Sequence, residues 1–131
     1  MGSLKMQACM NSKPLQPVQV EPDGWLVCLC AEWCNVCREF RPAFEALALQ
    51  YPGWRVLWID VEDEEDIVGE VEVETFPTVL VADGRQARFF GPVLPQAGML
   101  TRLVDNVQAG EGGAPCGSDI QQLLQRLWQG R

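Results

Sequence analysis

Cysteines are the residues best suited to chemistry in this sequence, and four of them lie close together. The cluster consists of Cys28, Cys30, Cys34 and Cys37, and two further cysteines stand apart at Cys9 and Cys116. A small secreted scaffold held together by disulfides would spread its cysteines among distant loops. The clustering therefore favours a reactive or a metal-binding site, while spacing alone assigns no partner to Cys9 or Cys116.

Cys34 and Cys37 are separated by two residues, Asn35 and Val36, where an apolar stretch gives way to a helical pattern. We expect Cys34 at or just before the helix N-terminus, where unpaired N–H groups and the helix dipole favour a thiolate. Cys37 follows one helical turn later, so the two sulfurs can meet in a disulfide. Cys34 should be exposed and attack, and Cys37 should be shielded and resolve the mixed disulfide.

A zinc site is the alternative use of the same cluster. Cys28 and Cys30 are two apart on a predicted strand, so they share one face, beneath the helix, and could complete a set of four ligands. A closed metal site would consume the reactive thiols, and a strand followed by this spacing is not a standard zinc arrangement. We therefore predict no metal and no bound cofactor, and interpret Cys28 and Cys30 first as small buried hydrophobes.

Composition and charge exclude several other classes of function. The sequence has no histidine, which removes Ser-His and Cys-His nucleophilic pairs and histidine metal sites. Its formal charge is −8, which argues against binding of nucleic acid or of anionic lipid. No apolar run reaches the roughly 20 residues that span a bilayer. Nine acidic side chains and no basic one lie in residues 60–74, either as a solvated face or as a surface that selects basic partners.

The elements that position the cysteines follow from hydrophobic periodicity. An apolar run over 25–30 predicts a strand buried on both faces, and residues 35–50 predict a helix that Pro42 should kink. The remaining expected elements are an extended segment over 15–20, strands over 55–60, 78–82 and 86–90, and helices over 63–71, 96–107 and from 118 onward. Gly91-Pro92 is expected to break the strand before it.

The order of these elements predicts one α/β domain with a mixed sheet. An early strand–helix–strand crossover implies parallel strands, and Asp83-Gly84 adds an antiparallel hairpin. A chain of 131 residues is too short for two independent cores. The expected organisation is an arm over 1–14, a domain over 15–108, a Gly-rich linker over 109–117 and a helix over 118–131. An apolar stripe on that last helix predicts packing on the domain or on a partner.

The segment 27–38 resembles the active-site segment of the thioredoxin family, with its strand, its Ala-x-Trp-Cys sequence and its CxxC pair. Pro42 stands eight residues after Cys34, as the helix-kinking proline does in that family. Phe76-Pro77-Thr78 is similar to the family's cis-proline segment. Gly91 matches the glycine that ends the last strand.

The resemblance implies a thioredoxin fold, a central mixed sheet flanked by helices, here with an extra C-terminal helix. It also implies dithiol–disulfide exchange with Cys34 and Cys37 as catalytic residues. A surface that captures an extended substrate peptide would then be formed by Trp33, Phe76, cis-Pro77 and Gly91. The implied partners are protein disulfide substrates and a reductase or other dithiol electron donor. We expect the protein itself to be a monomer.

Departures from the family pattern concern the redox chemistry. Asn35 and Val36 replace the Gly-Pro spacer that tunes the potential of thioredoxins. Cys28 stands where the family has a buried Asp that accepts the proton of the second cysteine, and Cys30 stands where it has a Trp. Deprotonation of Cys37 should therefore depend on water or on Cys28. We also predict that Cys28 or Cys30 forms an alternative disulfide with Cys37 under oxidation.

The sequence thus predicts a protein disulfide oxidoreductase, most simply a reductase. One alternative is a redox-sensing binding module with the same fold, and another is an oxidase or isomerase of an oxidising compartment. The first ten residues lack a basic stretch followed by an apolar core, so they predict no signal peptide. We therefore expect a cytoplasmic protein, or a periplasmic one if a leader has been removed.

Overall fold

The computed structural model describes residues 22–69, 71–84 and 86–130. The arm expected over 1–14, the extended segment over 15–20 and Cys9 lie outside these residues. No helix in the described ranges combines the length and the apolar character needed to cross a membrane.

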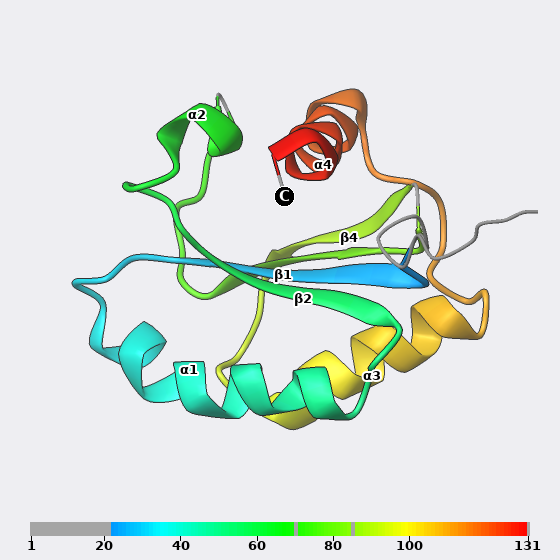
Figure 1. Cartoon of the computed structure of the whole chain (residues 1–131), viewed down its shortest axis with the longest axis horizontal. Helices are drawn as coiled ribbons and strands as arrows, with labels where there is room; N and C mark the ends of the chain where they lie inside the picture. The colour runs from blue at the N-terminus through cyan, green and yellow to red at the C-terminus, as the bar shows by residue number, and fades with distance from the viewer. Residues whose placement is uncertain (1–21, 70, 85, 131) are drawn as a thin grey trace, which may run out of the picture.

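Four strands form one mixed sheet in the order β2-β1-β3-β4 (Figure 1). The strands are β1 (Gly24–Cys30), β2 (Trp54–Asp60), β3 (Thr78–Ala82) and β4 (Ala87–Pro92). β1 runs parallel to β2 and antiparallel to β3, and β3 and β4 form the antiparallel hairpin expected at Asp83-Gly84. Gly84 has a φ of 80°, and the N–H of Asp83 donates to the carbonyl of Gln86. The mixed sheet predicted from the element order is confirmed.

Helices cover both faces of this sheet. On one face lie α1 (Asn35–Ala46), which continues into the 3-10 helix η2 (Leu47–Leu49), and α3 (Ala97–Gln108). On the other face lie the short α2 (Glu65–Val68) and α4 (Ser118–Gly130), as Figure 1 shows. The predicted helix over 35–50 is thus an α-helix that ends in a 3-10 turn, and α1 continues through Pro42.

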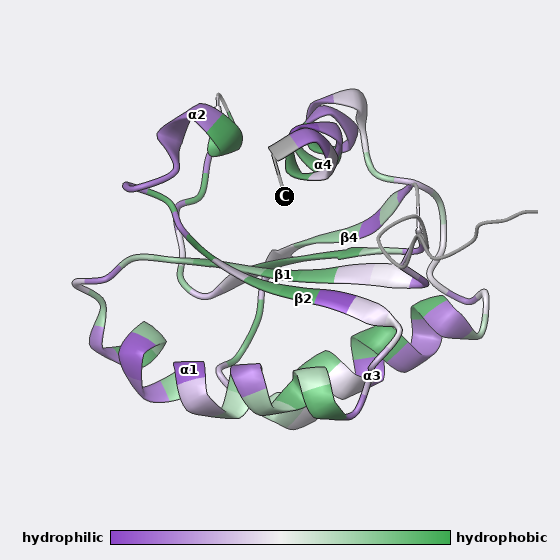
Figure 2. Cartoon of the chain, in the orientation of Figure 1, coloured by the Kyte–Doolittle hydropathy of each residue, from purple (hydrophilic) through white to green (hydrophobic). Residues whose placement is uncertain are grey.

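The alternation of side chains along β1 divides the core in two, and Figure 2 shows the apolar strands between the helices. Leu26, Cys28 and Cys30 point to the α1/α3 side, whereas Trp25, Val27 and Leu29 point to the α2/α4 side. All seven residues of β1 are buried. Because successive side chains of a strand face opposite ways, Cys28 and Cys30 lie beneath α1, as the sequence predicts.

Helix α4 packs on the sheet of its own domain. Its buried stripe consists of Ile120, Leu123, Leu124 and Leu127, which join the α2/α4 core. The side chain of Arg126 donates to the carbonyls of Ile67 at 2.6 Å and Val68 at 3.1 Å, at the end of α2. These bonds place a cation at the carbonyl end of α2 and hold α4 against it.

Two expected boundaries are wrong. β4 continues through Gly91 and ends at Pro92, although Gly91-Pro92 was expected to break it. β4 is an edge strand and Pro92 is its last residue, so the missing N–H disturbs no inner ladder. The helix expected over 63–71 is also shorter, since α2 spans only Glu65–Val68 and is followed by Gly69, whose φ of 64° lies outside the helical region.

Candidate active site

Cys34 occupies the N-cap of α1, in the loop that follows β1. Its backbone is extended, with φ −85° and ψ 117°, and its carbonyl accepts the N–H of Arg38 at 3.1 Å. Its N–H donates to the carbonyl of Ala31 at 3.0 Å, which closes the turn between strand and helix. The thiol is free and partly exposed. The predicted place of Cys34 at the start of the helix is confirmed.

Cys37 lies one turn into α1 and is joined by a disulfide to Cys30 at the end of β1, with 5.9 Å between the Cα atoms. Both cysteines have a relative exposure of 0%. The structure therefore shields Cys37, as expected, but its bond goes to Cys30 and leaves Cys34 free. This linkage is one of the two alternative disulfides that the sequence predicts for Cys37.

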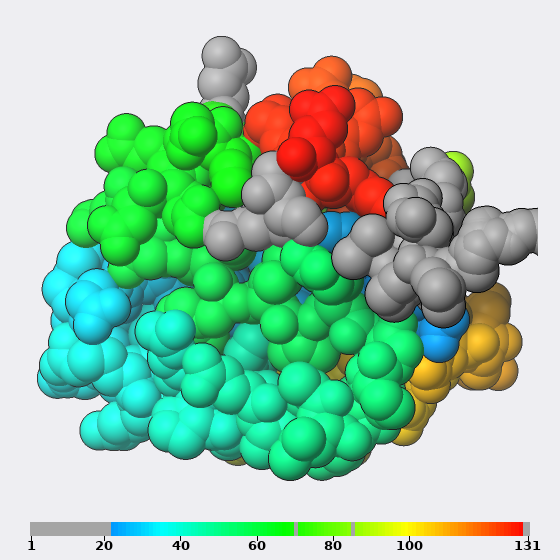
Figure 3. Space-filling model, viewed as in Figure 1, coloured from blue at the N-terminus to red at the C-terminus, as the bar shows by residue number. Residues whose placement is uncertain are grey.

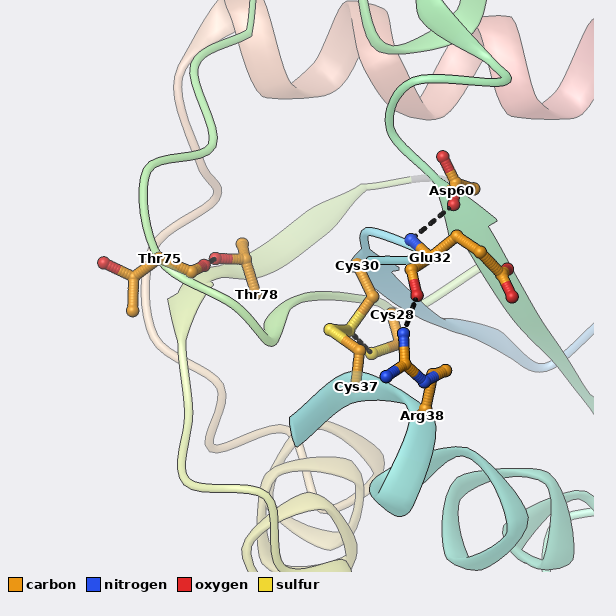
Figure 4. Close-up of a disulfide and its surroundings, with 8 residues drawn as sticks. All are labelled: Cys28, Cys30, Glu32, Cys37, Arg38, Asp60, Thr75 and Thr78. Carbon is orange, nitrogen blue, oxygen red and sulfur yellow. Dashed lines mark hydrogen bonds between the residues drawn. A yellow bond between two sulfur atoms is a disulfide. The ribbon is translucent and has the colours of Figure 1, made fainter. Parts of the chain in front are cut away.

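Cys28 adds a third sulfur behind the disulfide. In Figure 4, Cys28 and Cys30 extend from β1 toward Cys37, and the Sγ atoms of Cys28 and Cys30 are 3.8 Å apart. Because Cys30 is bonded to Cys37 and carries no proton, the thiol of Cys28 is the donor in this contact. Burial raises the pKa of Cys28 to about 12, so Cys28 is a neutral thiol at physiological pH.

Trp33 and Phe76 form an aromatic pair beside Cys34. The Trp33 ring is 62% exposed and meets Phe76 edge to face at a centroid distance of 5.7 Å. Its Nε1–H donates to a carboxylate oxygen of Glu62 at 3.0 Å. The bond between Phe76 and Pro77 is cis, and the carbonyl of Pro77 accepts the N–H of Val93 at 3.0 Å. The structure thus brings together the loop of Trp33 and the segment of Phe76.

Gly91 lines a groove whose lining does not include Trp33, Phe76 or Pro77. It pairs with Val79 across the β3–β4 ladder. The groove is lined by Glu72, Val73, Glu74, Thr75, Thr78, Phe90, Gly91 and Pro92. Thr78 is buried and donates its hydroxyl to the carbonyl of Thr75 at 2.5 Å. Residues 72–75, which precede Phe76 in the chain, therefore place the carboxylates of Glu72 and Glu74 in this groove.

The spacer residues Asn35 and Val36 are both exposed. The side-chain oxygen of Asn35 accepts a hydrogen bond from Arg38. Val36 is 42% exposed and lines a shallow groove with Glu39, Phe40, Ala43 and Pro95. Both spacer side chains are thus accessible beside Cys34, where they can meet a substrate.

Sequence reasoning missed two residues that fix this loop. Arg38 donates to the carbonyl of Glu32 at 2.7 Å, as Figure 4 shows. Asp60, at the end of β2, accepts the N–H of Glu32 at 2.8 Å, and its other oxygen accepts the N–H groups of Glu62 at 2.9 Å and Asp63 at 3.1 Å. In Figure 3, the segment after β2 and the loop before α1 lie side by side. The position of Asp60 at a strand end was the available signal.

Cys116 lies far from this cluster in the fold. It packs at the edge of the α2/α4 core, and burial together with Asp119 raises the pKa of its thiol. Among the described residues, no group of three or more His, Cys, Asp and Glu side chains is arranged to hold a metal ion.

Comparison of the sequence with known proteins identifies relatives of this chain. A rice (Oryza sativa subsp. indica) thioredoxin H-type is 36% identical over 58 residues, which are 44% of this chain and 48% of that protein. A thioredoxin of Mycoplasmoides gallisepticum is 34% identical over 58 residues, which are 44% of this chain and 58% of that protein. The chain thus spans about half the length of these curated relatives.

Solved structures support the same relationship. Oxidized mitochondrial thioredoxin 3 of Saccharomyces cerevisiae superposes with a TM-score of 0.58 at 25% identity, over 65% of this chain and 79% of that one. The family model for thioredoxin matches residues 10–104, which include the cysteine cluster, the cis-proline segment and Gly91. With this match over most of its length, the chain belongs to the thioredoxin family.

Proposed function

We propose that this protein is a thiol–disulfide oxidoreductase that reduces protein disulfides with Cys34 and Cys37. The observation that carries the proposal is the unequal exposure of the two cysteines. Cys34 is partly exposed at a helix N-terminus, whereas Cys37, one turn later, is fully buried and already engaged in a disulfide. This inequality suits a nucleophile that meets substrate and a partner that does not.

In the reduced protein, the Cys34 thiolate attacks one sulfur of a substrate disulfide. A Cys34–substrate disulfide forms, the substrate bond breaks, and the departing substrate sulfur takes the electron pair and a proton. The Cys37 thiolate then attacks Sγ of Cys34 and releases the second substrate thiol. Two electrons pass from the protein to the substrate, and a reductase or another dithiol donor must return them.

Contacts around Cys34 support capture of an extended substrate segment. Trp33 and Phe76 present an aromatic surface, and the cis bond before Pro77 lies in the same segment. An extended peptide would lie along residues 75–77 with its disulfide directed at Cys34. Asn35 and Val36 would contact it from the other side of the cysteine.

The test is reduction of insulin disulfides with dithiothreitol as the electron donor. We expect Cys34→Ser to abolish the reaction, and Cys37→Ser to accumulate a mixed disulfide with insulin. Cys116→Ser is the matched control and should retain the wild-type rate, because Cys116 lies on the opposite core. A wild-type rate in Cys34→Ser would refute the proposal.

The reduction potential of the reactive cysteines decides the direction of electron flow. A value near roughly −270 mV would fit a reductant of a reducing cytoplasm. A value between about −180 and −120 mV would instead indicate an oxidase or isomerase of an oxidising compartment such as the periplasm. Slow turnover combined with tight binding of a partner would indicate a redox-sensing binding module.

A further inference from the structure

The cysteine cluster offers Cys37 two partners, one on each side. Cys30 reaches it from the end of β1 and is bonded to it, and Cys34 precedes it by one turn of α1. Cys34 packs against the same core cluster that contains Cys30 and Cys37. Figure 4 shows why Cys30 is within reach, because the start of α1 lies directly over the strand end that carries it.

We propose that Cys30 is a third redox-active cysteine. Its sulfur replaces Cys34 as the disulfide partner of Cys37, so that the oxidised protein holds a Cys30–Cys37 disulfide and a free Cys34 thiol. This inference rests on the proposed function, since turnover of substrate produces the Cys34–Cys37 bond. It adds a step after turnover and assigns a redox role to a residue of the central strand.

The step is an internal thiol–disulfide exchange without net oxidation. The sulfur of Cys30 attacks Sγ of Cys37, the Cys30–Cys37 bond forms, and the Cys34–Cys37 bond breaks. The electron pair leaves on the sulfur of Cys34, and the proton that Cys30 gives up is balanced by one that Cys34 can take from solvent. The helix N-terminus favours negative charge on the departing sulfur of Cys34.

Burial determines what the exchange accomplishes. The Cys30–Cys37 disulfide has no exposed sulfur, since both residues have a relative exposure of 0%. An external thiol therefore has no direct access to it, and reduction must begin with attack of Cys34 on Cys37, the reverse of the same step. The protein would store its disulfide in the core while it keeps an accessible nucleophile at the surface.

Cys28 is a free, buried thiol beside the disulfide and is not bonded to Cys37. It donates its S–H to the Cys30 sulfur, with 3.8 Å between the two Sγ atoms. Because Cys37 is bonded to Cys30 and Cys28 is free, the exchange is assigned to Cys30, and Cys28 provides the matched control.

The experiment follows the linkage over time in the full chain. Reduced protein is mixed with an excess of insulin, samples are quenched in acid at intervals, free thiols are blocked with N-ethylmaleimide, and disulfide-linked peptides are mapped by mass spectrometry. We expect the Cys34–Cys37 linkage first and the Cys30–Cys37 linkage later. As the second linkage forms, N-ethylmaleimide should begin to label Cys34.

Variants separate the inference from the proposed function. Cys30→Ala should reduce insulin yet stop at the Cys34–Cys37 linkage, with Cys34 unlabelled, whereas the matched variant Cys28→Ala should still reach Cys30–Cys37. If wild-type protein reduces insulin but holds only Cys34–Cys37 at every time, the inference fails and the proposed function stands.

Two further outcomes are decisive. If Cys34→Ser, oxidised with glutathione disulfide, forms Cys30–Cys37 as fast as the wild type does, Cys34 is not on the route and the internal exchange is refuted. If the wild type does not reduce insulin at all, the proposed function fails, and the inference fails with it. The wild-type time course depends on no substitution in the core, so misfolding of a variant cannot obscure it.

Discussion

The carboxylate of Asp60 accepts the backbone N–H of Glu32 at 2.8 Å, across the turn that carries the chain from β1 to Cys34. With its second oxygen, Asp60 also accepts the N–H groups of Glu62 and Asp63, so one side chain holds the loop before α1 and the loop after β2 together. Glu62 in turn accepts the indole N–H of Trp33. The geometry of the nucleophile's loop thus depends on a residue at the end of the neighbouring strand.

Replacement of Asp60 by Asn should loosen this connection. The amide has one acceptor oxygen instead of two, and its NH2 group would face a backbone N–H on one side. We expect Asp60→Asn to lower the free energy of unfolding by about 1–3 kcal/mol and to slow the reduction of insulin. Urea unfolding and the insulin assay measure the two effects. Asp63→Asn removes the same charge from an exposed side chain and should change the free energy of unfolding by less than about 0.5 kcal/mol.

Burial of Cys28 predicts a loss of stability in alkali. Its folded pKa of about 12 lies above the ordinary value of 9.0, so the unfolded chain releases the proton first as the pH rises. The contribution of the neutral Cys28 thiol to the free energy of unfolding is fully present below pH 9. It is lost between pH 9 and 12, at about 1.4 kcal/mol for each pH unit. Urea unfolding of wild type and Cys28→Ala at several pH values, both with the Cys30–Cys37 disulfide intact, measures the pH dependence due to this group. Equal pH dependence in the two proteins would contradict the shift.

Two glycines should respond in opposite ways to alanine. Gly69 has a φ of 64°, and a Cβ there would lie 2.9 Å from a guanidinium nitrogen of Arg126. We expect Gly69→Ala to cost about 1–3 kcal/mol of stability. Gly98 lies in α3, is exposed, and has no atom within 4 Å of the added Cβ, so Gly98→Ala should be neutral or stabilise by up to about 1 kcal/mol. Thermal unfolding compares them, and a destabilised Gly98→Ala together with a neutral Gly69→Ala would reverse the expected order.

Acidic side chains next to Phe76 predict a preference for basic substrates. Glu72 and Glu74 line the groove with Thr75 and Gly91, and Glu62 lies at Trp33. We expect a higher kcat/KM for a disulfide peptide flanked by lysines than for one flanked by glutamates, and a smaller difference at high salt. Glu74→Lys should reduce the preference, whereas Glu111→Lys, which makes the same charge change in the loop after α3, should keep it. An equal loss in both variants would assign the effect to net charge alone.

Much of the fold could be predicted from the sequence because its signals are local. The continuous apolar run of β1, the hairpin signal at Asp83-Gly84 and the helical stripe of α4 each depend on residues close together in the chain. The N-cap position of Cys34 is also local. The end of β4 was misjudged, because whether Pro92 can close a strand depends on that strand lying at the edge of the sheet.

The partner of Cys37 could be narrowed by sequence but not decided. The spacing from Cys34 permits a disulfide, and so does the spacing of Cys30 once α1 is folded over β1. Which sulfur is nearest depends on how the helix start sits on the strand end, which is a tertiary relationship. The role of Asp60 in the loop before α1 was missed for the same reason, since its partner there, the N–H of Glu32, lies 28 residues earlier in the chain.

The side chain of Gln121 has a consequence for the solution behaviour of the protein. Its amide oxygen accepts the N–H of Ala87 at 2.9 Å, and its amide nitrogen donates to the carbonyl of Ala87 at 3.1 Å. Ala87 begins the edge strand β4, and its carbonyl also accepts the backbone N–H of Cys116 at 2.9 Å. Outer hydrogen-bonding groups of an edge strand that have no such partner are open to a strand of another molecule. Gln121 occupies at Ala87 the positions that an additional strand would use. Helix α4 therefore protects the start of β4 from edge-to-edge aggregation.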